Sequence, residues 1–131
     1  MTTEKRLITT GIILGGLAVA AGAFGAHGLK NLLPANQIQV FDTAVRYQFY
    51  HALALVSTGL ISHNFNNKNI VRAGNCFIGG IILFSGSLYL LSTSSLLSIN
   101  TSLIGPITPL GGLLMITGWI LLLVGILRSN P

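Results

Sequence analysis

Long uninterrupted apolar runs dominate the pattern of hydrophobic and polar positions along this chain. Four of them, separated by polar segments, cover approximately residues 7–26, 43–62, 71–91 and 110–127. An α-helix of about 20 residues is about 30 Å long, which matches the hydrocarbon core of a bilayer. Backbone groups in lipid must be paired internally, so these runs are expected to be helices. The pattern predicts an all-α membrane protein, a four-transmembrane-helix bundle, with residues 1–131 as one integral membrane domain.

The polar connection between the first two runs adds one further element. Pro34 supplies a turn or helix-start signal, and the apolar residues Ile38, Phe41 and Val45 follow it. This spacing predicts a short interfacial segment between helices 1 and 2 that leads into the second helix.

The first run also has some features of a secretory signal peptide. Lys5 and Arg6 precede it, and small residues gather near its end. The run is nevertheless longer than the roughly 7–15 apolar residues of a signal peptide, which favours a retained helix.

Composition supports the membrane prediction. Hydrophobic residues make up 51% of the chain and charged residues 7%, against about 25% charged in a typical soluble domain. The net charge of +5 comes from basic residues at the ends of apolar runs, with no basic patch. We therefore expect the lipid bilayer as a partner and no nucleic acid.

The basic residues also predict an orientation. Four spans place both termini and the 63–70 loop on one side, and this side carries five of the seven Lys and Arg residues. These five are Lys5, Arg6, Lys68, Arg72 and Arg128, against Lys30 and Arg46 on the other side. The bias predicts a multi-pass protein of the cell membrane with both termini and this loop in the cytoplasm.

Small residues recur at helical spacing in three of the runs, which predicts close helix packing. The positions are Gly11, Gly15, Ala18, Gly22 and Gly25 in the first run, Gly79 and Gly86 in the third, and Gly111, Gly118 and Gly125 in the fourth. A glycine-rich composition also produces some such spacing by chance, and packing glycines do not imply a cofactor.

Polar side chains gather at the outer end of the predicted bundle. They are His27, Asp42, Arg46, Tyr47, Tyr50 and His51. Asp42 and Arg46 have the spacing of an ion pair on one helix face, which would fix the structure. Alternatively, Arg46 binds an anion or a lipid headgroup. His51 is either a hydrogen-bonded core residue or a carrier of a proton or ligand.

Residues for catalysis or metal binding are scarce. The carboxylates are Glu4 and Asp42, far apart in the chain, and no nucleophile motif or phosphate loop occurs. Cys76 is the single cysteine, so neither an intramolecular disulfide nor a cysteine-based metal site can form. We expect no enzyme activity, no metal and no cofactor.

Three segments together resemble a known family. They are GAFGAHGLK from Gly22, FDTAVRYQFYHALAL from Phe41, and FSGSLYLL from Phe84, followed by GPITPLGG and GW. In this order they resemble the domain-of-unknown-function 423 family, the YgdD-like small inner-membrane proteins. The resemblance implies a four-helix protein of the bacterial inner membrane and supplies no reaction.

The resemblance also points to the outer end of the bundle. It implies that His27, Arg46, Tyr47, His51, Ser87, Tyr89, Thr108 and Pro109 belong to shared motifs. Pro106 and Pro109 are expected to start or kink the fourth helix, which could place Thr108 toward Arg46.

Two functions follow from these patterns. The favoured one is a non-enzymatic membrane scaffold or accessory subunit, acting as a homo-oligomer or within a larger membrane complex. The alternative is a binder or transporter of a small anion or lipid headgroup at the Arg46/His51 end of the bundle.

Overall fold

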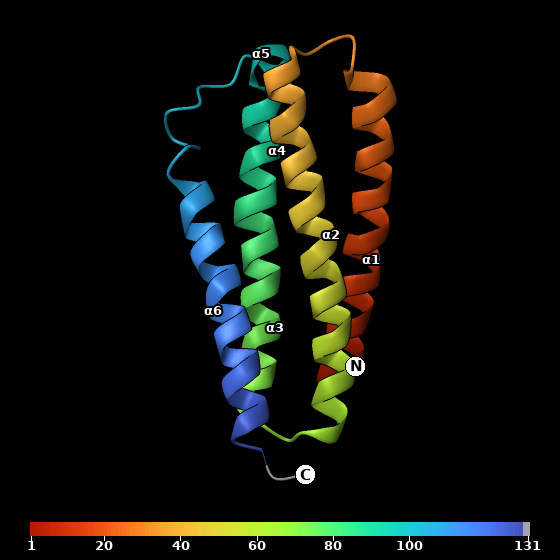
Figure 1. Ribbon diagram of the computed structural model, residues 1–131, viewed down its shortest axis with the longest axis vertical. Coiled ribbons are helices and arrows are strands. Elements are labelled where there is room, and N and C mark those ends of the chain that lie inside the picture. The colour runs from red at the N-terminus through yellow and green to blue at the C-terminus, as the bar shows by residue number, and fades with distance from the viewer. Residues whose placement is uncertain (130–131) are drawn as a thin grey trace.

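The computed structural model describes residues 1–129, and every regular element among them is helical. The elements are α1 (Thr3–Phe24), η1 (Gly25–Leu29), α2 (Ala35–Asn64), α3 (Lys68–Gly80), η2 (Ile81–Ser85), α4 (Gly86–Ser92), α5 (Ser94–Leu97) and α6 (Ile107–Leu127). Both η segments are π-helical. α1 runs directly into η1, and α3, η2 and α4 form one continuous rod, called the third rod below (Figure 1).

Three of these helical stretches are long and apolar enough to cross a membrane. They are Thr3–Leu29, Lys68–Ser92 and Ile107–Leu127. α2 is not among them, although its 30 residues make it about 45 Å long. The expected interfacial segment is not separate either. Ile38 and Phe41 lie in the first turns of α2, which continues without a break because nothing after Pro34 interrupts it.

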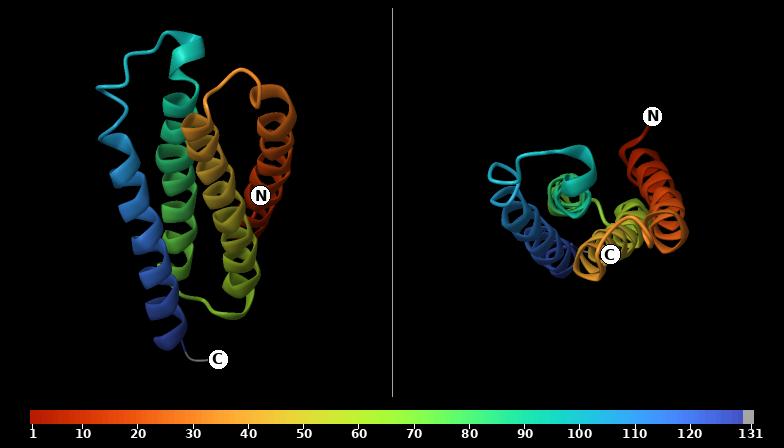
Figure 2. Two further views of the ribbon diagram at one scale, coloured as in Figure 1. Left: turned by 45° about the horizontal axis from the view of Figure 1, so that its top comes forward. Right: turned by 90° about the horizontal axis from the view of Figure 1, so that it is seen from above.

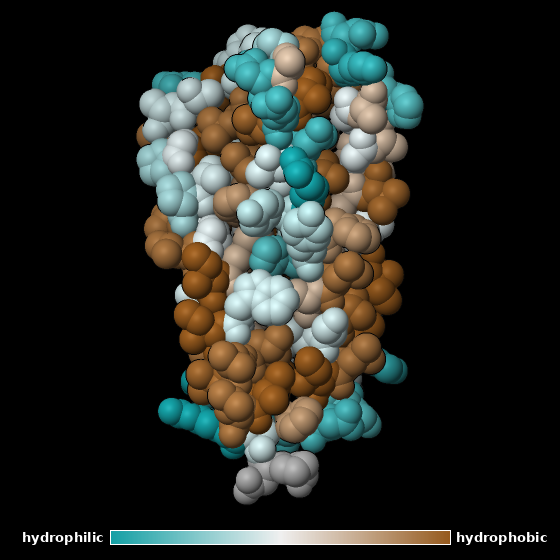
Figure 3. Space-filling view, viewed as in Figure 1, coloured by the Kyte–Doolittle hydropathy of each residue, from teal (hydrophilic) through white to brown (hydrophobic). Residues whose placement is uncertain are grey.

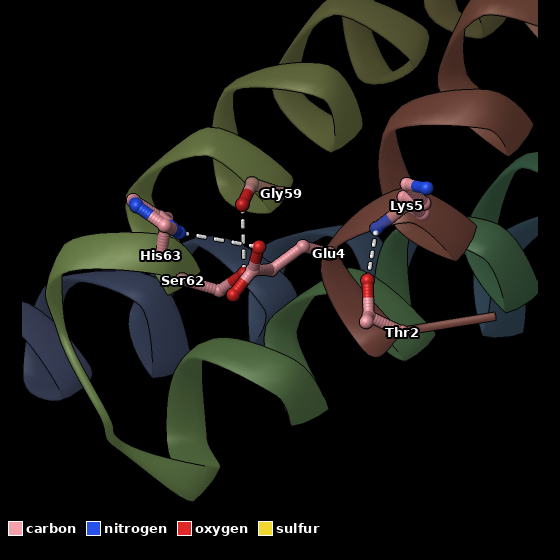
Figure 4. A network of polar contacts seen from close by, with 6 residues as sticks. All are labelled: Thr2, Glu4, Lys5, Gly59, Ser62 and His63. Carbon is pink, nitrogen blue, oxygen red and sulfur yellow. Dashed lines mark hydrogen bonds and ion pairs between the residues drawn. The ribbon is translucent and has the colours of Figure 1, made fainter.

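The long helices pack as neighbours in sequence order. α1 lies against α2, α2 lies against the third rod, and α6 lies against α3 and η2 (Figure 2). One end of the molecule holds the N-terminus, the α2–α3 loop and the end of α6. There Nδ1 of His63 lies 3.3 Å from Oε2 of Glu4 (Figure 4), and Ile70 packs beneath Gly125.

Glycines lie where the helices approach most closely. A Cβ on Gly11 would stand 2.7 Å from Val56 Cγ2 of α2, and one on Gly118 would stand 2.7 Å from Phe77 Cε1 of α3. The other predicted positions meet Val45 (Gly22), Phe41 (Gly25), Leu114 (Gly79), Phe84 (Gly111) and Ile70 (Gly125), whereas Gly15 is at ordinary contact distance from Ala52, and Ala18 is fully buried. Contacts as tight occur at glycines outside the predicted stripes, namely Gly59 with Ile8, Gly74 with Leu7 and Gly80 with Met115. A larger side chain at the tightest of these positions would force the helices apart.

The packing role predicted for Gly86 is wrong. A Cβ on Gly86 would meet nothing within 4 Å, whereas one on Gly80 would lie 2.6 Å from Met115 Cγ. The reason is the π-helical η2 between Gly79 and Gly86, because a π-helical turn contains more residues than an α-helical turn. Residues seven apart across η2 therefore do not share one face of the third rod.

Gly111→Ala and Gly86→Ala make a matched pair for testing this packing. A Cβ added to Gly111 would meet the backbone of Phe84, which cannot rotate away, so we expect a loss of about 1–3 kcal/mol of unfolding free energy. Gly86→Ala has open space and should be neutral or stabilising, because alanine favours helices. Reversible unfolding in mixed micelles measures both. Equal effects of the two substitutions would contradict this account.

Candidate functional site

Gln48 joins three helical segments inside the structure. Its side chain is buried on α2; Nε2 donates a hydrogen bond to the Leu14 carbonyl of α1 at 2.8 Å. On the other side, the Tyr89 hydroxyl of α4 donates to Gln48 Oε1 at 2.7 Å. Tyr89 also packs edge-on against Phe41, with ring centroids 5.0 Å apart. Both ends of the amide are thus used for holding helices together.

His51 has a partner on each ring nitrogen. It is 6% exposed, and its Nδ1 lies 2.8 Å from the Tyr47 carbonyl oxygen one turn earlier on α2. Trp119 Nε1 of α6 donates to His51 Nε2 at 3.2 Å. A carbonyl accepts and an indole N–H donates, so this geometry fits a neutral imidazole with its proton on Nδ1. The histidine therefore links α2 to α6 and has no free nitrogen for a ligand.

The remaining buried hydroxyls are also paired. Ser85 Oγ of η2 donates to the Ala44 carbonyl of α2 at 2.8 Å. Thr108 and Ser87 share a hydrogen bond of 2.6 Å between α6 and α4, so Thr108 is directed to Ser87. Among residues 1–129, no buried side-chain nitrogen or oxygen lacks a partner. The interior polar groups thus serve structure.

The outward side of α2 contrasts with this interior. Side chains on it recur at alternating spacings of four and three, and all are exposed or partly exposed. We call them the outer face of α2: Gln39, Thr43, Arg46, Tyr50, Leu53, Ser57 and Leu60. Figure 3 shows many pale and teal side chains over the upper half of this view and a mostly brown, apolar band over the lower half.

The ion pair predicted between Asp42 and Arg46 is absent. Both side chains are exposed or partly exposed, and the only ion pair among residues 1–129 joins His63 to Glu4. The residues next to Arg46 on α2 show its level in the bundle. The Ala44 carbonyl accepts a hydrogen bond from Ser85 of η2, and Tyr47 packs on Phe84 of η2. Phe84 in turn contacts Gly111 near the start of α6. Arg46 is therefore level with the first turns of α6, inside the layer of the apolar helices.

Two grooves border this face and separate the predicted cluster. The first has a volume of about 270 Å³; it lies between α1 and α2 and is lined by Gly22, Ala23, Arg46 and Tyr50, among others. The second has a volume of about 380 Å³; it lies between α2, η2 and α6 and is lined by aromatic and apolar side chains. Its lining residues are Tyr47, His51, Phe84, Gly112, Met115, Ile116 and Trp119. Arg46 and His51 thus line different grooves and do not form one pocket.

The other candidates lie apart from these grooves. His27 is exposed in η1, and within residues 1–129 neither His27 nor Asp42 has a side-chain hydrogen bond. No three His, Cys, Asp or Glu residues in the described part of the chain come together in a way that could hold a metal ion.

Sequence reasoning missed Gln48 and Trp119 and underrated Tyr89. Gln48 and Tyr89 are 41 residues apart, and Trp119 and His51 are 68 apart, so no local spacing connects the partners. The available signal was polarity: an amide in the middle of a long helix that packs against apolar helices must find a partner.

Apolar helices with internally paired polar groups define a class, namely a small α-helical membrane protein. The sequence profile described as "Protein of unknown function (DUF423)" matches residues 21–112. The chain therefore belongs to this family, as the motifs in its sequence indicated.

Similar proteins carry names of the same kind. The chain is 41% identical over 82 residues to the "UPF0382 membrane protein YwdK" of Bacillus subtilis, a match that covers 62% of this chain and 67% of the relative. It is 45% identical over 78 residues to a UPF0382 membrane protein of Staphylococcus saprophyticus, covering 56% and 64%. A Staphylococcus aureus relative is 41% identical over 81 residues, covering 62% and 66%. No solved structure matches the chain significantly.

Gln48→Leu and Tyr89→Phe, singly and together, test the interior network. Each single change leaves a buried polar group unpaired, so we expect each to reduce the free energy of unfolding by about 1–2 kcal/mol. The double variant should lose less than the sum, with a coupling energy of at least about 0.5 kcal/mol in mixed micelles. Tyr50→Phe is the control, because that side chain is exposed. Additive single effects would show that the bond contributes nothing.

Proposed function

We propose that this protein is a non-enzymatic membrane scaffold or accessory subunit that crosses a bacterial cell membrane four times. The family has no established activity, and the names of its relatives state only that they are membrane proteins. The argument therefore depends on what the residues of this chain do.

The geometry of the connections favours four crossings. Short links join α2 to α1 and to α3, and the residues between α2 and α3 are only Phe65, Asn66 and Asn67. α2 returns alongside α1 over its whole length (Figure 1). If α1 and the third rod cross the bilayer, α2 must cross between them. The side of α2 that faces the other helices carries polar groups, and a membrane can accommodate them because Gln48, His51 and the Ala44 carbonyl are hydrogen-bonded to neighbouring helices.

This arrangement predicts a topology. Lys5, Arg6, Lys68, Arg72 and Arg128 belong to the termini and the α2–α3 loop region, so these should lie in the cytoplasm. In cells of a Cys76→Ser variant, an impermeant thiol reagent should label a cysteine introduced at Leu103, in the α5–α6 connection. The same reagent should not label one introduced at Asn66. Reversed labelling would refute the orientation, and labelling of both sites would refute four crossings.

The outer face of α2 carries the functional proposal. All buried polar side chains among residues 1–129 have partners inside the bundle, whereas Arg46 lies exposed within the layer of the apolar helices. Arg46 lies in the outer part of this layer, so its cost in lipid is below the roughly 2.5–3.5 kcal/mol of an arginine at the centre of a membrane helix. A partner that lies against this face would remove the charge from lipid. We infer that the protein acts by holding another membrane segment on α2.

The alternative function is binding of a small anion or lipid headgroup by Arg46. It is favoured by the groove of about 270 Å³ beside Arg46 and Tyr50, whose apolar lining suits an acyl chain. His51 is not part of this alternative, because both of its nitrogens are occupied. The alternative requires a cation at position 46. Binding of an anion should therefore be lost in Arg46→Asp and should not be recovered when Asp42→Arg is added.

Photo-crosslinking in living cells tests the scaffold proposal. We expect a photoreactive residue at Tyr50 or Ser57 to form one discrete protein adduct, identified by mass spectrometry. The control is Ile13, which is exposed on α1 about one turn from the depth of Ser57, since it lies between Gly11, which contacts Val56, and Gly15, which contacts Ala52. Adducts of lipid alone at all three positions would refute the proposal.

A further inference from the structure

The outer face of α2 has the regularity of a helix–helix seam that nothing in the described part of the chain fills. Its positions alternate by four and three from Gln39 to Leu60, which is the repeat that keeps one side of a helix against a partner helix. The hydroxyls of Thr43 and Ser57 bond back to carbonyls of α2 itself, so they place no unpaired donor on the seam.

The two halves of this face differ in chemistry. The half toward the α2–α3 loop presents Leu53 and Leu60 with the small Ser57 between them, which permits close approach of an apolar helix. The half toward Pro34 presents Arg46, with Asp42 one turn earlier and beside the seam. A fitting partner therefore offers apolar side chains at one depth and both a cation and an anion at another.

The chain itself supplies such a partner. Its only acidic residues are Glu4 and Asp42, and Glu4 pairs with His63 at the opposite end. Asp42 and Arg46 do not pair within one copy, yet two copies inserted in the same orientation would place their α2 helices parallel. The four-residue offset of about 6 Å along the axis lets Asp42 of each copy reach Arg46 of the other.

We propose that the protein forms a symmetric dimer in the membrane through the outer face of α2, with two reciprocal Asp42–Arg46 ion pairs. The two-fold axis runs along the membrane normal, so each interface carries two cations and two anions and is neutral. Leu53 and Leu60 pack against their counterparts below. The inference rests on the proposed function and identifies the segment held on α2 as a second copy.

Cysteine crosslinking in native membranes locates the seam. In a Cys76→Ser background, Ser57→Cys should give a covalent dimer with a short bifunctional thiol reagent. Ile13→Cys, about one turn from that depth on the exposed side of α1, should give at least about fivefold less. Equal yields at the two positions would overturn the proposal.

Charge reversal tests the ion pairs in the Ser57→Cys chain. Asp42→Arg and Arg46→Asp, each alone, bring four like charges together and should reduce the dimer yield at least about tenfold. The double variant restores opposite charges and should recover the yield to within about twofold. The two side chains do not pair within one copy, and like charges four residues apart on a helix repel only weakly, so the helicity of the monomer should stay unchanged and its unfolding midpoint should shift only slightly.

The outcomes separate the possible occupants of this face. Loss of the dimer in both single variants with recovery in the double variant supports the proposal. Yields unaffected by any reversal overturn it. Sensitivity to Arg46→Asp alone, without recovery in the double variant, overturns it in favour of an anionic headgroup. A photo-crosslinked adduct at Tyr50 with a different membrane protein, and none with a second copy, overturns the dimer while leaving the scaffold function standing.

Discussion

The central constraint on this protein is that hydrocarbon offers no hydrogen-bond partner, so polar side chains among membrane helices must be paired by protein. α2 concentrates the problem, because Gln48 and His51 lie in its middle. Each is paired with a different neighbour: Gln48 with α1 and α4, and His51 with α6. The least apolar of the long helices is thus held by bonds to the helices around it.

Close packing makes these bonds possible. Hydrogen bonds of 2.7–2.8 Å between different helices require the helix axes to stand at a defined separation. Glycines supply it: Gly11 lets α1 rest on Val56, and Gly118 accommodates the Phe77 ring. The π-helical η2 contributes in another way, because it carries Ser85, which bonds to the Ala44 carbonyl, and packs against Gly111. Packing and polar pairing therefore depend on one another.

The same constraint separates the inside of α2 from its outer face. Among residues 1–129, every buried side-chain nitrogen or oxygen has a hydrogen-bond partner, and several of these bonds join α2 to its neighbours. Arg46 is exposed at the level of the first turns of α6, and its position on a regular face is the basis of the proposed association with another membrane segment. Under the scaffold proposal, a partner's side chains would enter the grooves that lie on the two sides of α2.

The sequence by itself determined the helical class and the family, because apolar runs of bilayer length are a local property. The predicted runs 7–26, 71–91 and 110–127 lie within the stretches Thr3–Leu29, Lys68–Ser92 and Ile107–Leu127, whereas α2 begins at Ala35, eight residues before the predicted 43. Spacing on one helix is local too, and it indicated Gly11, Gly111 and Gly118, but it left out Gly59, Gly74 and Gly80, which lie as close to neighbouring helices. The sequence did not determine the register of Gly86, which depends on a π-helical turn, or the partners of Gln48 and His51. Their partners on other helices are more than 30 residues away, so only the tertiary structure decided them. The structure also separates Arg46 from His51, which the sequence had placed in one cluster. The two side chains face different neighbours of α2, because the rotation of α2 about its own axis is set by its packing against the other helices.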